Sequence, residues 1–232
     1  MRIALIGNGK MGRAVAALAE ERGHIIHTVV HRSENAGGRA LTRERLGEVD
    51  VALEFTRPDA VVGNLERLSQ LGVPTVTGTT GWGEELSRIT RLFQERQGAL
   101  LHAANFAVGV HLFLRAAREL ARAFRSRPEF GVAIREEHHQ SKLDAPSGTA
   151  LQLQRQLGAE DPGRTFPITS VRSGEAVGTH TLTYTGPHET VTLSHLSLSR
   201  RAFAAGAISA AEWLPGQTGV FTFEEMLFGA PA

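Results

Sequence analysis

The chain has 232 residues, 41% of them hydrophobic, and its 25 basic and 24 acidic residues leave a net charge of +1, a composition typical of globular proteins and a length that fits two modest domains. The charge is close to neutral and the sequence has no basic stretch rich in aromatic residues, so we do not expect nucleic acid as a partner. No apolar run approaches the roughly 20 residues of a membrane span. We therefore expect a soluble, cytoplasmic protein with no membrane partner. The chain has no cysteine, which excludes thiol nucleophiles, zinc–thiolate sites and disulfides.

Residues 1–106 alternate short apolar runs with amphipathic stretches. The apolar runs predict strands at residues 3–6, 25–30, 51–55, 75–77 and 99–102, and the amphipathic stretches predict helices near residues 11–19, 60–71 and 84–96. Thr56 and Asp59 have the spacing of a capping box, so we expect them to begin the second of these helices. Repeated strand–helix units predict a parallel sheet with helices on both faces.

After this region the pattern changes to one long helix and then to strands with one solvated face. The long helix starts near residue 108, strands are predicted at 130–136, 168–172, 179–184 and 190–196, and a helix lies near 148–157. This favours an α/β chain with a second, α+β domain built on an open antiparallel or mixed sheet. A helix at 203–214 and a run at 219–222 are expected to return to the first domain. The expected domains are therefore residues 1–106 with 204–232, and residues 107–203.

A glycine-rich motif follows the first predicted strand and opens the first helix. It reads Gly7-Asn8-Gly9-Lys10-Met11-Gly12, the G-x-G-x-x-G pattern in the context that a dinucleotide fingerprint needs. In such a motif the first glycine allows a tight turn, the second lets backbone amides reach the pyrophosphate, and the third lets helix and strand pack closely. The alternative is a glycine-rich turn without a ligand. We expect a Rossmann-like dinucleotide-binding domain.

Two further segments bear on the dinucleotide. Gly78, Thr79 and Thr80 follow another predicted strand, where open parallel sheets bind ligands, although a short Gly-Thr loop is also a common polar connector. After the second strand stand His31 and Arg32, at the place where an acidic residue commonly binds the adenosine ribose and repels the phosphate of NADP. We therefore expect NADPH to bind at least as well as NADH.

The densest group of reactive side chains lies in residues 136–150, which leave a strand, pass through a loop and enter a helix. Ser147, Gly148 and Thr149 near the helix start offer amides and hydroxyls to a carboxylate. His138 and His139 can exchange protons near neutral pH. The alternatives are that the histidines pack, that Ser147 only caps the helix, or that the histidines bind a metal with Asp144. Neighbouring strand residues point to opposite faces, so we expect no metal.

Lysine is rare in this chain. Of the 25 basic residues only Lys10 and Lys142 are lysines, and both fall inside the two motifs. Arginine does not release its proton near neutral pH, whereas lysine can. Lys142 is therefore a candidate proton donor, with chance as the alternative.

The segment E-x-H-H-x-x-K-x-D-A-P-S-G-T-A from Glu136 to Ala150 resembles the signature of the dihydrodipicolinate reductase family. The resemblance extends to residues 7–12, 55–58, 78–81, 103–106 and 172–181 and so covers essentially the whole chain. It implies NAD(P)H-dependent reduction of 4-hydroxy-tetrahydrodipicolinate, a small cyclic dicarboxylate, in lysine and diaminopimelate biosynthesis. It also implies a Rossmann-like domain completed by the C-terminal tail, and a sheet domain that binds substrate and builds a homotetramer.

The resemblance also implies roles for individual residues. His138 and Lys142 would handle protons, and His139, Lys142, Ser147, Gly148 and Thr149 would bind the carboxylates of the substrate. The implied cofactor-binding residues are Gly7, Asn8, Gly9, Lys10, Met11, Gly12, His31, Arg32, Phe55, Gly78, Thr79, Thr80, Ala103, Ala104, Asn105 and Phe106. The chain departs from the family pattern in three places: it is shorter between Gly158 and Ile168, Thr179 precedes His180 where many members have an acidic residue, and His31 stands at the ribose-binding position.

Two other functions remain open at this point. One is another Rossmann enzyme, such as an imine reductase or an amino-acid dehydrogenase. The other is a non-catalytic NAD(P)H sensor, which would need a DNA-binding helix pair with a basic face. Neither end of the sequence supplies such a pair.

Overall fold

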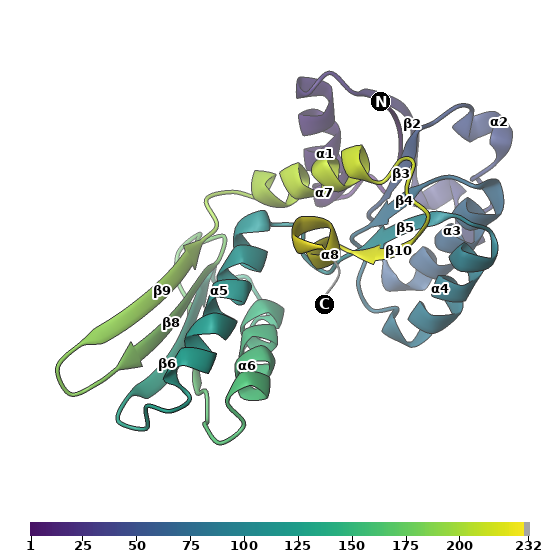
Figure 1. Cartoon of the computed structure of the whole chain (residues 1–232). Helices are drawn as coiled ribbons and strands as arrows, with labels where there is room; N and C mark the ends of the chain where they lie inside the picture. Colours follow the sequence, from purple (N-terminus) through teal and green to yellow (C-terminus); the bar gives the residue numbers. More distant parts are fainter. Residues whose placement is uncertain (230–232) are drawn as a thin grey trace. The chain divides into compact units, whose positions relative to one another are not determined.

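A computed structural model describes residues 1–229 of the chain, which fold into two compact units (Figure 1). Unit 1 comprises Met1–Ala107 and the chain from Arg201 onward, and unit 2 comprises Val108–Arg200. The second crossing between the units lies three residues before the expected position of 204, because the helix α7 (Arg201–Trp213) begins there and its first turn goes with the rest of the helix.

Unit 1 contains a six-stranded sheet in the order β10-β5-β4-β3-β1-β2. All of its neighbouring strands are parallel, which confirms the predicted sheet. The strands are β1 (Arg2–Ile6), β2 (Ile25–Val30), β3 (Val51–Glu54), β4 (Thr75–Thr77), β5 (Ala99–His102) and β10 (Gly219–Thr222). The direction of winding reverses between β1 and β3, and ligands bind beyond the carboxyl ends of the strands at such a point. The C-terminal tail joins this sheet through β10, as expected.

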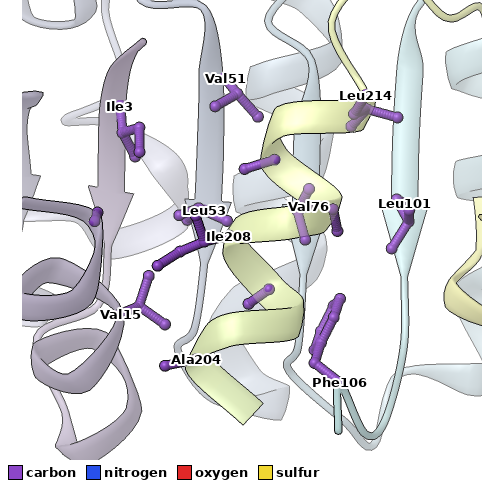
Figure 2. Close-up of a cluster of buried hydrophobic side chains, with 14 of the residues drawn as sticks. Ile3, Val15, Val51, Leu53, Val76, Leu101, Phe106, Ala204, Ile208 and Leu214 are labelled. Atoms are coloured by element: carbon purple, nitrogen blue, oxygen red, sulfur yellow. The ribbon is translucent and has the colours of Figure 1, made fainter. Parts of the chain in front are cut away.

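Helices cover both faces of this sheet. They are α1 (Lys10–Glu21), α2 (Arg43–Leu46), α3 (Pro58–Leu71), α4 (Leu86–Glu95), α7 and α8 (Phe223–Phe228), with short 3-10 turns at Arg32–Glu34, Ala36–Gly38 and Gly83–Glu85. Figure 2 shows α7 lying across the sheet, with Ile208 and Leu214 packed over residues such as Leu53 and Val76. Leu68 of α3 packs on the opposite face, against Ala4 and other strand residues.

The start of α3 differs from the prediction. The helix begins at Pro58 with Arg57 as its N-cap, and no side chain caps it. Proline is well suited to the first helical position because its fixed φ matches the helix and its missing N–H is not needed there. Thr56 instead donates its hydroxyl to the buried carboxylate of Glu54. The predicted capping box of Thr56 and Asp59 is therefore wrong.

Unit 2 contains a four-stranded sheet in the order β7-β6-β8-β9. Its strands are β6 (Gly131–His138), β7 (Ile168–Arg172), β8 (Thr179–Thr185) and β9 (Thr190–Leu196). The β6–β7 pair is parallel and the other two pairs are antiparallel, which confirms the mixed sheet. The helices α5 (Val108–Phe124) and α6 (Gly148–Glu160) pack on each other, and they contact β9 and β6 respectively.

Strand β6 runs two residues further than predicted, to His138. Alternate strand residues share a face, so Ile134, Glu136 and His138 lie together on the buried face, while Arg135 is exposed. The strand therefore delivers a carboxylate and an imidazole side by side into the interior of unit 2.

No helix within residues 1–229 is both long enough and apolar enough to span a bilayer.

Candidate functional site

The three glycines of the first loop occupy three different environments. A Cβ on Gly7, whose φ is +95°, would lie 2.2 Å from the carbonyl oxygen of Phe55, and a Cβ on Gly12 would lie 2.1 Å from the carbonyl oxygen of Gly7. Both positions therefore require glycine for close backbone approach. Gly9 is the N-cap of α1 without a side-chain cap, and a Cβ there would meet nothing within 4 Å. The space beside Gly9 and the free amides of the helix start fit a phosphate group.

A cavity of about 430 Å³ opens beside this loop. Of the residues expected to bind cofactor, it is lined by Gly7, Asn8, Gly9, His31, Arg32 and Phe55. Ser33, whose hydroxyl can donate a hydrogen bond to a phosphate, lines it too. Sequence reasoning gave no cofactor-binding role to the other lining residues, which are Val30, Asn35, Thr56, Arg57, Ala60 and Asn64. Their contribution depends on how α3 and the 3-10 turns pack against the loop, and no local pattern reports that.

Two arginines at this cavity share one carboxylate. Arg32 Nη2 lies 3.5 Å from Asp59 Oδ2, and Arg57 Nε lies 3.7 Å from Asp59 Oδ1. The first acidic residue after β2, Glu34, accepts hydrogen bonds from the Arg45 side chain at 2.6 Å and the His31 amide at 2.8 Å. These two bonds lower the pKa of Glu34 to about 2. Glu34 is thus held ionised and engaged within the protein.

A second cavity, of about 170 Å³, lies at the other glycine-containing loop. The expected residues Thr79, Thr80, Ala103 and Ala104 line it, together with Gly81, Trp82, Gly83, Leu86 and His102. Burial lowers the pKa of His102, and the charge of Glu225 opposes that shift. The side chain of His102 is therefore neutral at neutral pH and offers both a donor and an acceptor to a polar group.

The remaining residues expected to bind cofactor line neither cavity: Lys10, Met11, Gly12, Gly78, Asn105 and Phe106. Some of them support the lining. A Cβ on Gly78 would lie 2.2 Å from the ring of Phe55, so that glycine allows the ring to pack against the loop. Phe106 is buried and makes edge contacts with Phe55 and Phe223 at centroid distances of 6.0 and 5.0 Å.

In unit 2 a fully buried carboxylate, Glu136, organises the reactive segment. Its Oε1 accepts hydrogen bonds from Arg172 at 2.7 Å and from the Ser147 amide at 3.3 Å. Its Oε2 bonds to Nδ1 of His138. Burial raises the pKa of Glu136, but hydrogen bonds from Arg172, Ser170 and His138 outweigh burial and lower it to about 2. The carboxylate is therefore ionised and can only accept.

The ionised Glu136 fixes the tautomer of His138. Because a carboxylate accepts, Nδ1 of His138 must carry the hydrogen in this bond, and the neutral ring then has a free electron pair on Nε2. Burial lowers the pKa of His138, and the hydrogen bond and charge of Glu136 oppose that shift. At neutral pH His138 is thus a neutral proton acceptor whose orientation is set by Glu136.

Lys142 lies in the loop between β6 and α6. Its Nζ donates to both carboxylate oxygens of Asp144, at 2.7 and 2.9 Å, and this ammonium lowers the pKa of Asp144. Arg172 Nη2 also donates to the backbone oxygen of Asp144 at 2.6 Å. Arg172 therefore connects the loop that carries Lys142 to the Glu136 carboxylate that orients His138.

Ser147 is the N-cap of α6, and its Oγ accepts from the amide of Ala150 at 3.2 Å. The same oxygen lies 3.1 Å from Nε2 of the buried His180. A Cβ on Gly148 would meet nothing within 4 Å, and the amides of a first helical turn have no helical acceptor. Ser147 does cap the helix, and the helix start also remains open to an anionic group.

The structure thus gathers His138 and Ser147 around Glu136. His139 lies beyond the strand end, where its Nδ1 is 2.8 Å from the hydroxyl of Ser141. Sequence reasoning gave no role to Glu136, Arg172 or His180. Glu136 had a usable signal, since it stands two residues before His138 and so shares its strand face. Within residues 1–229 no group of three or more acidic, histidine or cysteine side chains is arranged to hold a metal ion.

Comparison with known proteins gives the same family over the whole chain. Residues 1–106 match the family model described as dihydrodipicolinate reductase, N-terminus, and residues 109–227 match the one described as dihydrodipicolinate reductase, C-terminus. The 4-hydroxy-tetrahydrodipicolinate reductase of Christiangramia forsetii is 33% identical, with 98% of each chain covered. That of Natronomonas pharaonis is 34% identical, with 97% of this chain and 99% of the relative covered.

A solved structure shares the fold. The dipicolinate-bound dihydrodipicolinate reductase from Paenisporosarcina sp. TG-14 superposes with a TM-score of 0.79 at 24% identity and covers 97% of this chain and 99% of its own. Its likeness agrees with the Rossmann-like sheet and separate mixed sheet described above. Both family models and the full-length relatives confirm the resemblance seen in the sequence, and the chain belongs to the dihydrodipicolinate reductase family.

Proposed function

We propose that this chain is a 4-hydroxy-tetrahydrodipicolinate reductase that uses NAD(P)H and acts in lysine and diaminopimelate biosynthesis. The observation that carries the proposal is the arrangement in unit 2 of His138, ordered by a buried carboxylate, with Lys142 and an open helix start in one continuous segment. The full-length relatives named for this activity support it. A cytoplasmic location is part of the proposal, since the reaction consumes a nicotinamide cofactor.

Unit 1 would hold the cofactor. The first cavity would take the adenosine half, with the pyrophosphate at the open position of Gly9, and the second cavity would take the nicotinamide half between Thr79 and Ala103. The bound cofactor supplies the hydride. The contribution of the protein in this unit is to fix the orientation of the dinucleotide.

Unit 2 would hold the cyclic dicarboxylate. Carboxylates are bound best by charge-assisted donors, and the amides of Gly148 and Thr149, the hydroxyl of Thr149 and the ammonium of Lys142 are donors of that kind. His139 would add a further donor at the end of β6. Asp144 is the partner of Lys142 here, so a substrate carboxylate would compete with Asp144 for the ammonium.

The substrate first loses its 4-hydroxyl group as water, which leaves a conjugated ring. The reduction then adds hydride at carbon four of that ring and a proton at the neighbouring carbon. Lys142 carries an ammonium that can donate this proton, and a positive group also stabilises the charge that develops as the hydride arrives. His138 offers the complementary group, an unprotonated Nε2 that can accept a proton. The pair therefore supplies one donor and one acceptor without a metal.

We also propose a homotetramer assembled through unit 2. Strand residues that alternate with the buried ones, such as Ala133, Thr183 and Ser194, leave the second face of the sheet without a covering helix of unit 2. A second copy of the chain would cover that face. Light scattering of the purified protein should give about four times the chain mass of 25.0 kDa, and a mass of one chain would contradict this assembly.

The decisive experiment is a turnover assay with the purified protein, NADPH or NADH, and 4-hydroxy-tetrahydrodipicolinate generated enzymatically. Oxidation of the cofactor should depend on the substrate and yield tetrahydrodipicolinate. Activity on acyclic 2-oxo acids with ammonia, in place of this substrate, would instead favour an amino-acid dehydrogenase. Tight cofactor binding without turnover of any imine would favour a sensor.

A further inference from the structure

A second buried carboxylate, Glu54, lies at the end of β3 in unit 1 and is 0% exposed. The other residues of this strand, Val51, Ala52 and Leu53, are apolar and equally buried, as is usual in a parallel sheet with both faces covered. A buried carboxylate is expensive unless it is hydrogen-bonded, and an apolar residue would serve the core better. Its presence here therefore calls for a specific role.

Glu54 accepts hydrogen bonds from three side chains on three different segments. Thr77 of β4 donates its hydroxyl to Oε2 at 2.7 Å, and Asn64 of α3 donates to Oε1 at 3.1 Å. The hydroxyl of Thr56, in the turn after β3, donates to the same Oε1. Within residues 1–229 no ion pair to Glu54 is formed, so these donors alone satisfy it.

The network extends from Glu54 to the lining of the first cavity. Asn64 lines that cavity and accepts through Oδ1 from Nδ2 of Asn35 at 2.8 Å. Asn35, which also lines it, accepts through its own Oδ1 from the amide of Ala40 at 3.1 Å. Thr56 is a third lining residue. Glu54 therefore holds two residues of the cavity lining directly, Thr56 and Asn64, and a third, Asn35, through Asn64.

The other arm of the network reaches the second cavity. Thr77 accepts from the amide of Thr79 at 3.3 Å, and the Thr79 hydroxyl accepts from the amide of Thr56 at 2.8 Å. The backbone oxygen of Thr79 accepts from the indole of Trp82 at 2.7 Å. Thr79 and Trp82 both line the second cavity. Glu54 is therefore the junction between hydrogen bonds that fix the two loops.

We propose that Glu54 is a positioning residue for the dinucleotide, which sets the loop after β3 and the loop after β4 in register so that both cavities accept one extended ligand. This inference rests on the proposed function, since it treats the two cavities as parts of one cofactor site. Glu54 itself touches neither cavity and acts through Asn64, Thr56 and Thr77.

The Thr77 hydroxyl donates to Glu54 and accepts from the amide of Thr79. Thr77 must donate to Glu54 in order to keep an electron pair for the amide of Thr79. In Glu54→Gln, the amide oxygen has to face Asn64 and Thr56, which leaves an NH₂ group facing Thr77. Thr77 would then receive two donors, and its own hydrogen would lose the acceptor that Glu54 provided. The loop at Thr79 should shift although the residue volume is unchanged.

The test uses Glu54→Gln and Thr77→Val, with Thr77→Ser as the conservative variant that keeps the hydroxyl. Thr75→Val is the matched control, because Thr75 is also fully buried on β4 but its hydroxyl donates to the backbone oxygen of Val73. All are made in a Trp213→Phe background, so that Trp82 is the single tryptophan. Emission of Trp82 without cofactor, and titration of NADPH and NADH, are measured for each.

Glu54→Gln and Thr77→Val should shift the Trp82 emission. They should also weaken the binding of both cofactors by about tenfold or more, as expected for the loss of a buried hydrogen bond to a charged group. The Michaelis constant for cofactor should rise while the turnover number changes little. Thr77→Ser and Thr75→Val should behave like the parent. If Thr77→Val does not fold, the emission and the cofactor titrations of Glu54→Gln decide whether the inference holds.

Parent-like Trp82 emission and cofactor affinity in a folded Glu54→Gln protein would overturn the inference. Equal losses of cofactor affinity in Thr75→Val and Thr77→Val would also overturn it. Either result would mean that Glu54 has a purely structural role. If the parent protein binds neither NADPH nor NADH, the proposed function fails. The emission comparison would then still decide whether Glu54 sets the loop, so the two failures are distinguishable.

Discussion

Nδ1 of His138 is hydrogen-bonded to the buried carboxylate of Glu136, two residues earlier on the same face of β6. Glu136 accepts every bond it makes, so its charge dictates which nitrogen of His138 carries the hydrogen. Glutamine at this position would have to turn its NH₂ group toward His138, because Arg172 and the Ser147 amide already donate to the other oxygen. Nδ1 would then become the acceptor and Nε2 would gain the hydrogen.

We therefore expect Glu136→Gln to lower the turnover number by about 100-fold or more, the usual effect of removing a general acid–base group, with a small change in the Michaelis constant for substrate. Nitrogen NMR shifts of the imidazole should report the exchanged tautomer. Glu137→Gln is the control, since Glu137 pairs with Arg135 on the other face. An unchanged turnover number in Glu136→Gln would show that the tautomer does not matter.

His138→Gln should likewise lose about 100-fold or more in turnover with weaker effects on substrate binding. The pKa of His138 is lowered from its ordinary value by burial, so the ring is neutral from pH 7 upward. If Lys142 donates the proton and His138 acts as the neutral acceptor, turnover should stay level from pH 7 to 8. A steep rise in turnover as the pH falls toward 5 would mean that protonated His138 is the donor.

For Lys142 we expect both Lys142→Arg and Lys142→Ala to lose most of the turnover. Arginine keeps the positive charge but does not give up its proton near neutral pH. The arginine variant should still bind substrate better than the alanine variant, because it keeps a charge for the carboxylate. Steady-state kinetics of both variants measure this. Near-normal turnover in Lys142→Arg would contradict the role of Lys142 as proton donor.

Acid should destabilise unit 2 through His180. Burial and, to a smaller degree, the charge of His138 lower the pKa of His180 to about 4. Since the unfolded residue titrates near 6.5, the unfolded chain binds the proton first, and stability that is complete above that pH is lost as the pH falls toward 4. Between pH 7.5 and 4.5 the free energy of unfolding should fall by about 2–3 kcal/mol more in the native chain than in His180→Gln.

Urea titrations at the two pH values measure this difference. His188→Gln, a change at an exposed histidine of the same unit, is the control and should follow the native chain. Equal pH dependence in His180→Gln and the native chain would show that His180 titrates normally.

The sequence was most informative where function depends on local geometry. The turn at Gly7, the close packing at Gly12 and the open position of Gly9 all follow from neighbours within a few residues or from strand–turn–helix order. The segment from His138 to Thr149 is similarly continuous. The sequence alone therefore indicates this segment as a candidate site.

What the sequence left out depends on contacts between distant segments. Thr56 looked like a helix cap, but Glu54 recruits its hydroxyl and Pro58 begins the helix. Arg172 reaches Glu136 from 36 residues further along the chain, and His180 reaches Ser147 from 33 residues further along. Neither partner has a periodic or spaced pattern that would reveal it. Buried polar junctions were thus the least predictable part of both units.

The helix start at Gly148 offers a clean test of carboxylate binding. We expect pyridine-2,6-dicarboxylate, a planar mimic of the ring, to compete with substrate. Gly148→Ala combined with Thr149→Val should raise the inhibition constant of this compound by about tenfold or more. A Cβ at Gly148 meets no protein atom within 4 Å, so it would obstruct only a ligand. Gly158→Ala, with equally open space on the same helix, is the matched control. Unchanged inhibition in the double variant would place the carboxylates elsewhere.

The choice between NADPH and NADH should depend on Arg32. An acidic residue after the second strand commonly binds the ribose and repels the extra phosphate; here His31 stands at that position, and the nearest carboxylate, Glu34, is engaged by Arg45. Arg32 lines the first cavity, and Asp59 holds it only at 3.5 Å, so its guanidinium is available to a phosphate. NADPH should therefore bind at least as well as NADH.

Arg32→Ala should weaken NADPH by about ten- to hundredfold, the size expected for a charge-assisted contact, and NADH much less. Arg39→Ala is the control, because Arg39 is an exposed arginine at the end of the neighbouring 3-10 turn and does not line the cavity. Calorimetric titrations at two salt concentrations provide a second measurement. In the native chain salt should weaken the binding of NADPH more than the binding of NADH, because salt screens the contact between Arg32 and the phosphate. In Arg32→Ala salt should weaken the binding of both cofactors equally. Equal shifts of both cofactors in Arg32→Ala would mean that Arg32 does not recognise the phosphate, and Arg57, on the other side of Asp59, would then be the residue to change.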